Sequence, residues 1–424
     1  MSGDRSDFDL GVALSAWMND AAPRSVPVPV LEEAFARTMS SRQVRVYPWE
    51  RLAGRGRRAR GTTAFALAAT AAVLVAALAF GMLGGGFGIA PAPAPTPSPT
   101  PLPTATPVPA RSPSPSPRAL VAVPITPIAS IDVGKPQGLA SDGTAVWILT
   151  ESGTVQRIDP ATNALGPPIA TGGTSDFYQG ISADKSGVWV TEWNTATLYR
   201  VDPAASKLSA TIESGLAPKG VLATDTAVWV ADTHDGKVLR IDPATNKIVA
   251  TITVGPTGSS GPNWLASGLG SIWVDIPNDQ TVVRIDAKTN LIQATIPIPN
   301  EATPCGGFAV TGSVVWNMPC DGPQVMTRID PVTNTAVTAV DLGDQGHDPA
   351  VIGGVPWVSI YTGDGNAGRL GRISATTNAV DLELAPGATF GGGGDMVVAS
   401  GSVWVIDGGN DRVLRLPLAG FPPG

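Results

Sequence analysis

Short runs that alternate between hydrophobic and polar residues fill the C-terminal part of the chain, and one pattern returns seven times. Each copy holds a small-residue turn, an apolar run through a Trp, a second run through an Arg, and a last run such as KIVATITVG at 247–255. Alternating runs of this length, bounded by Gly, Pro, Asn and Asp, predict β-strands. The tryptophans that mark the copies are Trp147, Trp189, Trp229, Trp273, Trp316, Trp357 and Trp404. Their mean spacing is about 43 residues, the length of a four-stranded propeller blade.

The two ends of the repeat region predict how the ring of blades closes. The last copy stops after its third strand, RVLRLPL at 412–418, and therefore lacks an outer strand. The segment IASIDVG at 128–134 has the pattern of an outer strand but no blade of its own. Pairing these two segments leaves no open sheet edge. We therefore predict an all-β, seven-bladed β-propeller over residues 119–424, with an N-terminal strand closing the last blade.

A long apolar segment precedes the repeat region. Residues 62–84 carry no charge, and about twenty apolar residues suffice to cross a bilayer as a helix. Five arginines lie at 51–60, and the next cation is Arg111. Because positively charged flanks stay in the cytoplasm, the propeller is expected outside it, behind one transmembrane helix of a single-pass membrane protein. A cleaved signal peptide is the alternative, but the 60 residues ahead of the segment exceed the usual n-region.

Two further segments flank the predicted helix. Residues 1–60 place apolar residues at helical spacing in 7–19 and 29–43, which predicts a cytoplasmic segment with two short helices. Because these helices are too short to enclose a core, the segment is either a partly ordered tail or, in residues 1–50, a docking element for a cytoplasmic partner. Residues 91–118 alternate Pro with Ala, Ser and Thr, which predicts a Pro-rich, disordered stalk.

Composition and charge narrow the classes of function. Lys, Arg, Asp and Glu make up only 15% of the chain, which holds 49 Gly and 40 Pro. This composition fits a turn-rich β domain and disfavours a helical enzyme. Residues 119–424 contain 16 basic and 28 acidic side chains, a net charge of −12. The predicted propeller is therefore not expected to bind nucleic acid.

Residues that recur in every blade are expected to serve the blade. The tryptophans and one Arg in each third strand form such sets, so we assign both to packing and pairing between blades. The recurrent run DPATN, at 159–163 in the first copy, superficially resembles an acidic metal loop. A hairpin turn explains it better, because Asp bonds the backbone, Pro fixes φ and Asn tolerates the left-handed conformation. The arginines are Arg157, Arg200, Arg240, Arg284, Arg328, Arg372 and Arg415.

Function is expected where the repeat is broken at the mouth of the central channel. The position ten residues before each Trp is polar in five of the seven copies, and the position three residues after it is acidic in three. Polar groups and aromatic rings around a concavity predict a small-molecule, sugar or peptide site. A solvated rim without a ligand is the alternative. The polar set is Gln137, Gln179, Lys219, Asn263 and His347, the acidic set is Glu192, Asp232 and Asp407, and the aromatic set is Tyr178, Trp193, Trp264 and Tyr361.

The chain has two cysteines, Cys305 and Cys320, which fall in loops of the same predicted blade on the channel-mouth face. No His accompanies them, and the compartment outside the cytoplasm is oxidising. We therefore predict a disulfide rather than a metal pair.

The runs IDPATN at 241–246 and KIVATITVG at 247–255 resemble the YVTN or YncE-like propeller repeats. The run GVWVTEW at 187–193 resembles the streptogramin B lyase (virginiamycin B lyase) group, whose propeller also has seven blades. Both resemblances imply the same fold, whereas propellers host many unrelated activities. In the lyase group a His, an acid after the second strand and a bound Mg²⁺ carry out elimination. His347 matches that His, but Ile360 stands at the acid position of the same blade.

We therefore predict an extracytoplasmic, non-catalytic propeller that acts as a ligand- or protein-binding scaffold module. Its expected partners are the cell membrane, through one helix, and a cell-wall component, sugar, peptide or partner protein at the channel mouth. We expect neither a cofactor nor a metal site. The alternative is a streptogramin B lyase-like carbon-oxygen lyase that uses His347 and a divalent cation, Mg²⁺.

Overall fold

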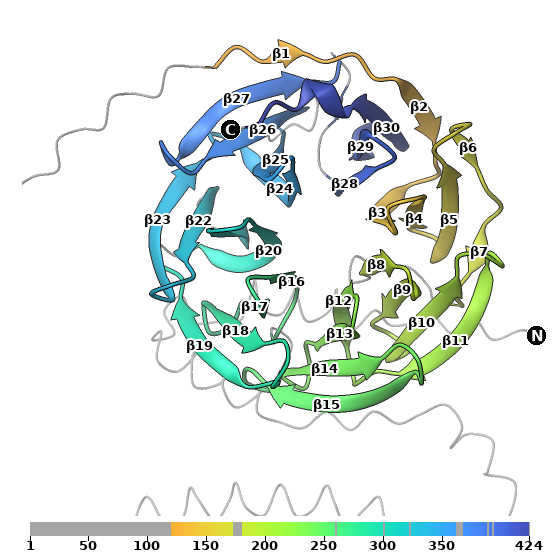
Figure 1. Cartoon of the computed structure of the whole chain (residues 1–424), viewed down its shortest axis with the longest axis vertical. Coiled ribbons are helices and arrows are strands. Elements are labelled where there is room, and N and C mark those ends of the chain that lie inside the picture. The colour runs from red at the N-terminus through yellow and green to blue at the C-terminus, as the bar shows by residue number, and fades with distance from the viewer. Residues whose placement is uncertain are drawn as a thin grey trace, which may run out of the picture. The chain divides into compact units, whose positions relative to one another are not determined.

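A computed structural model describes residues 120–172, 180–258, 261–299, 302–321, 324–361, 368–387, 390–391 and 394–423. Figure 1 shows a ring of seven sheets around a central axis, and the innermost strands are β3, β8, β12, β16, β20, β24 and β28. The predicted all-β, seven-bladed propeller is therefore confirmed. The expected cytoplasmic segment, transmembrane helix and stalk lie outside the described residues. Within the described ranges, no helix is long and apolar enough to cross a membrane.

The blades are numbered in chain order. Blade one is β3 (Pro136–Ser141), β4 (Val146–Thr150), β5 (Thr154–Asp159), β6 (Ala164–Leu165) and β7 (Ile169–Ala170). Blade two is β8 (Ile181–Asp184), β9 (Gly187–Glu192), β10 (Thr197–Asp202) and β11 (Lys207–Glu213). Blade three is β12 (Pro218–Thr224), β13 (Ala227–Asp232), β14 (Lys237–Asp242) and β15 (Lys247–Thr253). Blade four is β16 (Leu265–Gly268), β17 (Ser271–Ile276), β18 (Thr281–Asp286) and β19 (Ile292–Pro297).

The remaining blades follow the same order. Blade five is β20 (Thr303–Val310), β21 (Val315–Asp321), β22 (Val325–Asp330) and β23 (Thr335–Asp341). Blade six contains β24 (Gln345–Ile352), β25 (Val355–Tyr361), β26 (Gly368–Ser374) and β27 (Ala379–Ala385). Blade seven contains β28 (Met396–Ala399), β29 (Ser402–Asp407) and β30 (Arg412–Pro417), with short 3-10 turns η2 (Gly408–Asn410) and η3 (Leu418–Gly420).

The core consists of apolar side chains between neighbouring blades. The second strand of a blade, such as β13, is buried over its whole length because each of its faces contacts another blade. The seven tryptophans of these strands are at most 1% exposed. Trp189 of blade two, for example, packs in one cluster with Val221 and Leu239 of blade three. Burial on both faces explains why the runs around each Trp are continuously apolar.

An arginine in the third strand joins most blades to the next. Arg200 lies over the Trp189 ring, 4.8 Å from its centroid, and donates to Asn246 Oδ1 of blade three at 2.8 Å. Asn246 has a φ of 57°, the left-handed conformation that the turn assignment predicts. The same hydrogen bond joins Arg240 to Asn290, Arg284 to Asn334, Arg328 to Asn378 and Arg415 to Asn163. The recurrent Arg, Trp and turn residues therefore hold the scaffold together.

The first two strands of the described chain and its last residues complete blades six and seven (Figure 1). The strand β2 (Ala129–Asp132) pairs antiparallel with β30, which confirms the predicted closure. A strand that the sequence did not predict, β1 (Val123–Pro124), pairs in parallel with β27 of blade six. Because the fourth strand of blade seven comes from the N-terminus, that blade has no turn to accept Arg372. The carbonyls of Pro422 and Pro423 accept from Arg372 instead, at 3.3 and 2.8 Å.

Asn334 gives its blade turn both a left-handed backbone and a side-chain acceptor for Arg284, and two substitutions separate these contributions. Its φ is 54°, and its Oδ1 accepts from Arg284 at 2.9 Å. Asn334→Gly keeps the left-handed backbone but removes the acceptor, which is expected to lower the free energy of unfolding by about 1 kcal/mol. Asn334→Ala is expected to cost about 1 kcal/mol more, because Ala is strained in this conformation. Urea denaturation measures both variants, and equal losses would contradict the assigned role of the turn.

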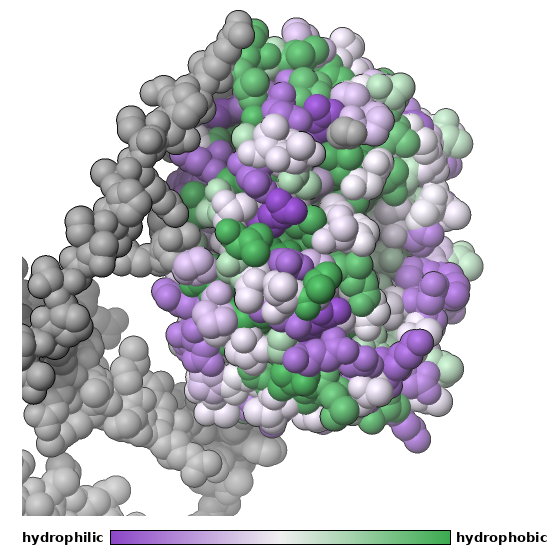
Figure 2. Space-filling model, turned by 60° about the vertical axis from the view of Figure 1, so that its left-hand side comes forward, coloured by the Kyte–Doolittle hydropathy of each residue, from purple (hydrophilic) through white to green (hydrophobic). Residues whose placement is uncertain are grey.

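The outer surface mixes residue types. Figure 2 shows hydrophobic and hydrophilic residues interspersed over the face that it draws, rather than gathered into one apolar field. Exposed apolar side chains such as Val249, Ile292 and Val337 come from the outer strands of three different blades. Scattered exposed apolar residues of this kind are normal for a soluble domain surface.

Candidate ligand-binding site

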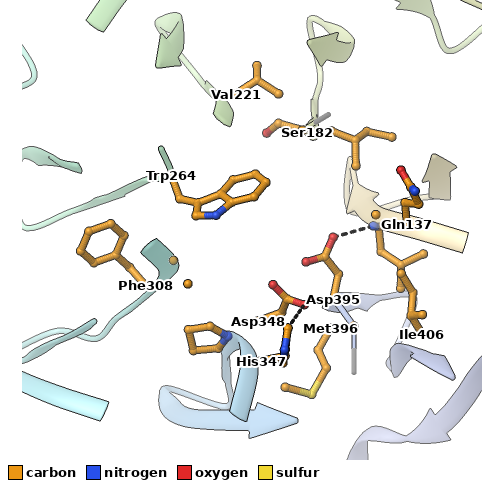
Figure 3. A pocket seen from close by; sticks show the side chains of 18 of the residues that line it. Gln137, Ser182, Val221, Trp264, Phe308, His347, Asp348, Asp395, Met396 and Ile406 are labelled. Atoms are coloured by element: carbon orange, nitrogen blue, oxygen red, sulfur yellow. Dashed lines mark hydrogen bonds and ion pairs between the residues drawn. The ribbon is translucent and has the colours of Figure 1, made fainter. Parts of the chain in front are cut away.

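A cavity of about 660 Å³ lies on the propeller axis, and residues of all seven blades line it. This volume is in the range of small-molecule sites. Figure 3 shows an apolar and aromatic wall, which includes Trp264, Phe308 and Met396, around a small number of polar side chains. The cavity therefore has the composition of a ligand site.

One position of the repeat distinguishes the blades at this cavity. Nine residues before the second-strand Trp, blades four, six and seven carry Trp264, Asp348 and Asp395, and the other four carry glycine. All three side chains line the cavity, and Figure 3 shows them directed into the same open space. A Cβ on Gly220 would collide with the backbone of the next blade at Asn263. The glycines are Gly138, Gly180, Gly220 and Gly307.

Asp348 lies in a β-bulge of β24, where the pairing with β25 is shifted between His347 and Ala350. Its φ is 44°, a left-handed conformation that Asp adopts more readily than most residues. Successive residues of a regular strand point to opposite faces, and a bulge re-aims them. His347 and Asp348 therefore both reach the cavity although they are adjacent in sequence.

Asp395 comes just before β28 and joins the last blade to the first. Its Oδ2 accepts from the backbone N–H of Leu139 at 2.8 Å. A Cβ on Gly138 would lie 2.8 Å from Ile181 Cγ2, so the close approach of blade two favours glycine here. Desolvation raises the pKa of Asp395 to about 8, and the nearby charge of Asp348 adds to the rise. Desolvation also raises the pKa of Asp348 to about 6, although 37% of its side chain is exposed to the cavity.

His347 and Tyr361 form the wall of blade six. A hydrogen bond joins Tyr361 Oη and His347 Nε2 at 2.6 Å. Burial lowers the pKa of His347, so the imidazole is neutral near pH 7. The titratable side chains among the described lining residues are these two, Asp348 and Asp395, and none is a Lys or Arg. The described wall is therefore acidic.

Other residues that the sequence predicted lie beside the cavity. Lys219 Nζ is 5.5 Å from the centroid of the Trp264 ring, and burial lowers the pKa of Lys219. Asn263 is 7% exposed, and its carbonyl accepts from the N–H of Gly220 at 2.9 Å. Trp193 is half-buried outside the wall. Of the predicted residues, the wall includes Gln137, Trp264, His347 and Tyr361, while Tyr178 and Gln179 lie outside the described residues.

The three predicted acids are buried and hold loops in place. Glu192, Asp232 and Asp407 are each at most 1% exposed, and none is among the lining residues of the cavity. Asp407 accepts from the N–H of Gly391 at 2.9 Å and pairs with Arg412 at 2.7 Å. Asp232 accepts from two backbone N–H groups of the segment before β12. Buried carboxylates require such partners, and here the backbone supplies most of them.

Asp275, displaced by one position from the acidic set, positions the aromatic wall. Its Oδ1 accepts from the N–H of Trp264 at 2.7 Å, and its Oδ2 from the N–H of Gly307 at 3.3 Å. Desolvation raises the pKa of Asp275 to about 7, although these bonds and the charge of Lys219 oppose the rise. Asp275 thus fixes the Trp264 segment of blade four against blade five.

The predicted disulfide between Cys305 and Cys320 is confirmed, with a Cα–Cα distance of 5.2 Å. The two cysteines lie in β20 and β21 rather than in loops, because these strands extend further toward the cavity than the repeat predicts. Gly306, next to Cys305, lines the cavity. Closing a loop of this length restricts the unfolded chain and contributes about 3 kcal/mol to the stability of the folded propeller.

Comparison with known proteins supports the fold. No family model matches the chain, and no curated protein matches it. Solved structures do match, among them the hydrazine synthase of Kuenenia stuttgartiensis, with a TM-score of 0.55 and 13% identity over 68% of this chain and 97% of that one. At this identity the likeness shows a shared fold alone. The chain is therefore a seven-bladed β-propeller.

Proposed function

We propose that this protein is a non-catalytic binding module whose site is the axial cavity. The observation that carries the proposal is the replacement of glycine by Trp264, Asp348 and Asp395 at one position of the repeat. A left-handed Asp and a carboxylate with a raised pKa both destabilise the folded protein. Features that cost stability and break a repeat are expected at functional sites.

We further propose that the propeller is held outside the cytoplasm by a transmembrane helix at 62–84 and a stalk at 91–118. The support is the charge pattern around the apolar segment and the disulfide Cys305–Cys320, since disulfides persist in oxidising compartments. In this arrangement a YVTN or YncE-like propeller presents its cavity to a sugar, a peptide, a wall component or a group on a partner protein.

A streptogramin B lyase-like activity is the second candidate, and one observation favours it. His347 lines the cavity and is hydrogen-bonded to Tyr361, so a general base is present. The Mg²⁺ of that family is not matched, because the described part of the chain places no three His, Cys, Asp or Glu side chains to hold a metal. The residues present do not fit that ion, and the binding role is preferred.

A thermal-shift screen of the full-length protein tests the proposed function. Sugars, short peptides and small molecules of either charge are added in turn, and at least one is expected to raise the melting midpoint by binding the folded state. Trp264→Gly introduces the residue that four other blades carry, so the fold is expected to persist while the shift falls. Val249→Ala, on an outer strand, is the control. An undiminished shift in Trp264→Gly, or no shift with any compound, would overturn the proposal.

A further inference from the structure

We propose that the axial cavity binds an organic cation, with its guanidinium or ammonium group between the carboxylates of Asp348 and Asp395 and the ring of Trp264. This inference rests on the proposed function and names the chemical class of its ligand. Figure 3 shows the two carboxylates side by side at the open space that the indole also faces.

The first support is the charge of the wall. The described lining residues include two carboxylates and neither Lys nor Arg. An anionic ligand would therefore meet repulsion, whereas a cation is attracted at short range in a poorly solvated site. Trp264 adds an electron-rich face, which attracts cations within about 6 Å of the ring centroid.

The second support is the open acceptor capacity of the carboxylates. Asp395 Oδ2 accepts from the Leu139 N–H, but the nearest ring nitrogen to Asp348, His347 Nδ1, is 3.9 Å from Oδ2 and too far for a hydrogen bond. Within the described residues, no side chain or backbone group donates to the Asp348 carboxylate. The Asp348 carboxylate is 37% exposed to the cavity, so its oxygens are open to the N–H groups of a guanidinium or ammonium.

The third support is that a metal ion and a neutral sugar each fit this wall less well than an organic cation. The described residues contain no group of three or more His, Cys, Asp or Glu side chains that could hold a metal ion, and a bare ion would leave the aromatic and apolar wall without a contact. A neutral sugar would leave the desolvated carboxylates without an opposite charge. An organic cation neutralises them and also fills a cavity of about 660 Å³, where Phe308, Met396 and Val221 contact its hydrocarbon part.

Binding of this kind releases protons. Burial raises the pKa of Asp348 and Asp395, so the empty cavity holds a proton near neutral pH that a bound cation displaces. Affinity for a permanent cation is therefore expected to rise with pH. Among the described residues of the wall, the other titratable groups are His347, with a lowered pKa, and Tyr361, with a raised one. Lys219 is not among the lining residues, but its Nζ lies 5.5 Å from the centroid of the Trp264 ring, and burial lowers its pKa while the charge of Asp275 opposes this.

Calorimetric titration of the full-length protein tests the inference with two probes of the same shape. The n-butylguanidinium ion stays charged at every pH used, whereas n-butylurea is neutral. At pH 8.5 the guanidinium is expected to bind on the order of ten-fold more tightly than the urea. Its affinity is expected to fall on the order of ten-fold by pH 6, while that of the urea stays constant.

Variants identify the groups responsible. Asp348→Asn/Asp395→Asn keeps the side-chain shapes, and guanidinium binding is expected to drop to the level of the urea and to lose its pH dependence. If the double variant does not melt cooperatively, the single variant Asp348→Asn is titrated in its place. Asp330→Asn, at the end of β22 and outside the cavity wall, is the control and should leave binding unchanged.

The outcomes separate the two proposals. If n-butylurea or pentanoate binds as tightly as the guanidinium, and Trp264→Gly abolishes that binding, the cavity is a ligand site but not a cation site. The inference then fails and the proposed function stands. Failure of n-butylguanidinium to bind at pH 8.5 also overturns the inference, and a screen without any hit overturns both.

Discussion

Deletion of residues 119–134 from the full-length chain is expected to lower the free energy of unfolding by about 5 kcal/mol or more and to produce oligomers. The segment supplies β1 and β2, and it buries Ile125, Ile131 and Val133, which are 7%, 8% and 1% exposed. Burial of each such side chain contributes about 1.5–3 kcal/mol, so the loss approaches the stability of a typical domain. The uncovered edge of β30 then offers unpaired backbone groups to another chain. Light scattering after size exclusion and guanidinium denaturation measure the two effects.

A shorter deletion separates the contribution of β1 from that of β2. Removing residues 119–126 eliminates β1 and Ile125 but leaves β2 on β30, so this variant is expected to stay monomeric and to lose less stability. A variant without residues 119–134 that stayed monomeric and melted unchanged would contradict the observed closure of the ring.

Asp395→Asn is expected to stabilise the protein more and more as the pH rises from 5 to 8.5, by about 2 to 4 kcal/mol at the upper end. Desolvation, together with the charge of Asp348, raises the pKa of Asp395 to about 8 in the folded protein. The amide oxygen of Asn keeps an acceptor for the N–H of Leu139. The variant therefore removes the charge and retains the link between blades seven and one.

Proton binding sets the sign of this effect. In the unfolded chain the Asp395 carboxyl loses its proton near pH 4, but in the folded protein it keeps the proton to about pH 8. Its contribution to stability is therefore complete at low pH and is lost as the pH rises through the folded pKa. Asp330→Asn is the matched control, because backbone hydrogen bonds lower the pKa of Asp330 and its titration lies below this range. Urea denaturation at several pH values measures the difference in the free energy of unfolding between Asp395→Asn and the wild type. A difference that does not change with pH would contradict the raised pKa of Asp395.

The scaffold was predictable because it repeats. The seven tryptophans, the arginines that lie over most of them and the Asn residues of the turns recur at one spacing, and each is buried or hydrogen-bonded in the same way. The outer strand at 128–134 and the disulfide Cys305–Cys320 followed from an incomplete last copy and from cysteine spacing. The strand β1 was missed because two paired residues carry no periodic pattern.

The candidate site was predicted only in part, because bulges change which side chains face the axis. Shifts in the pairing of β3, β12, β20 and β24 fall beside the inner-strand starts, so adjacent residues such as His347 and Asp348 both reach the cavity. The expected position therefore located Gln137 and His347 but not Asp348 and Asp395. The sequence signal lies one residue further on, nine residues before each Trp. Four copies have glycine at this position, and the other three have Trp264, Asp348 and Asp395.

The acids after the second strands were predicted at the channel mouth, but in the structure they do not line the cavity. Asp232 and Asp407 break the repeat in sequence, yet they are buried and accept backbone N–H groups of neighbouring loops. A short buried carboxylate next to a loop satisfies donors that the strands leave unpaired, and sequence alone does not distinguish this from a ligand contact. A structural carboxylate differs from a ligand-binding one in that nearby backbone N–H groups already donate hydrogen bonds to its oxygens.

Restoring glycine at the three cavity positions tests most directly whether they form the binding site. Trp264→Gly/Asp348→Gly/Asp395→Gly gives blades four, six and seven the residue that the other four carry at this position. The measurement is a calorimetric titration of n-butylguanidinium at pH 8.5 into the full-length wild-type protein and into this variant, whose cooperative melting establishes that it is folded. We predict binding to the wild type and no detectable binding to the variant, whereas equal affinity for both proteins would contradict the assignment of the site.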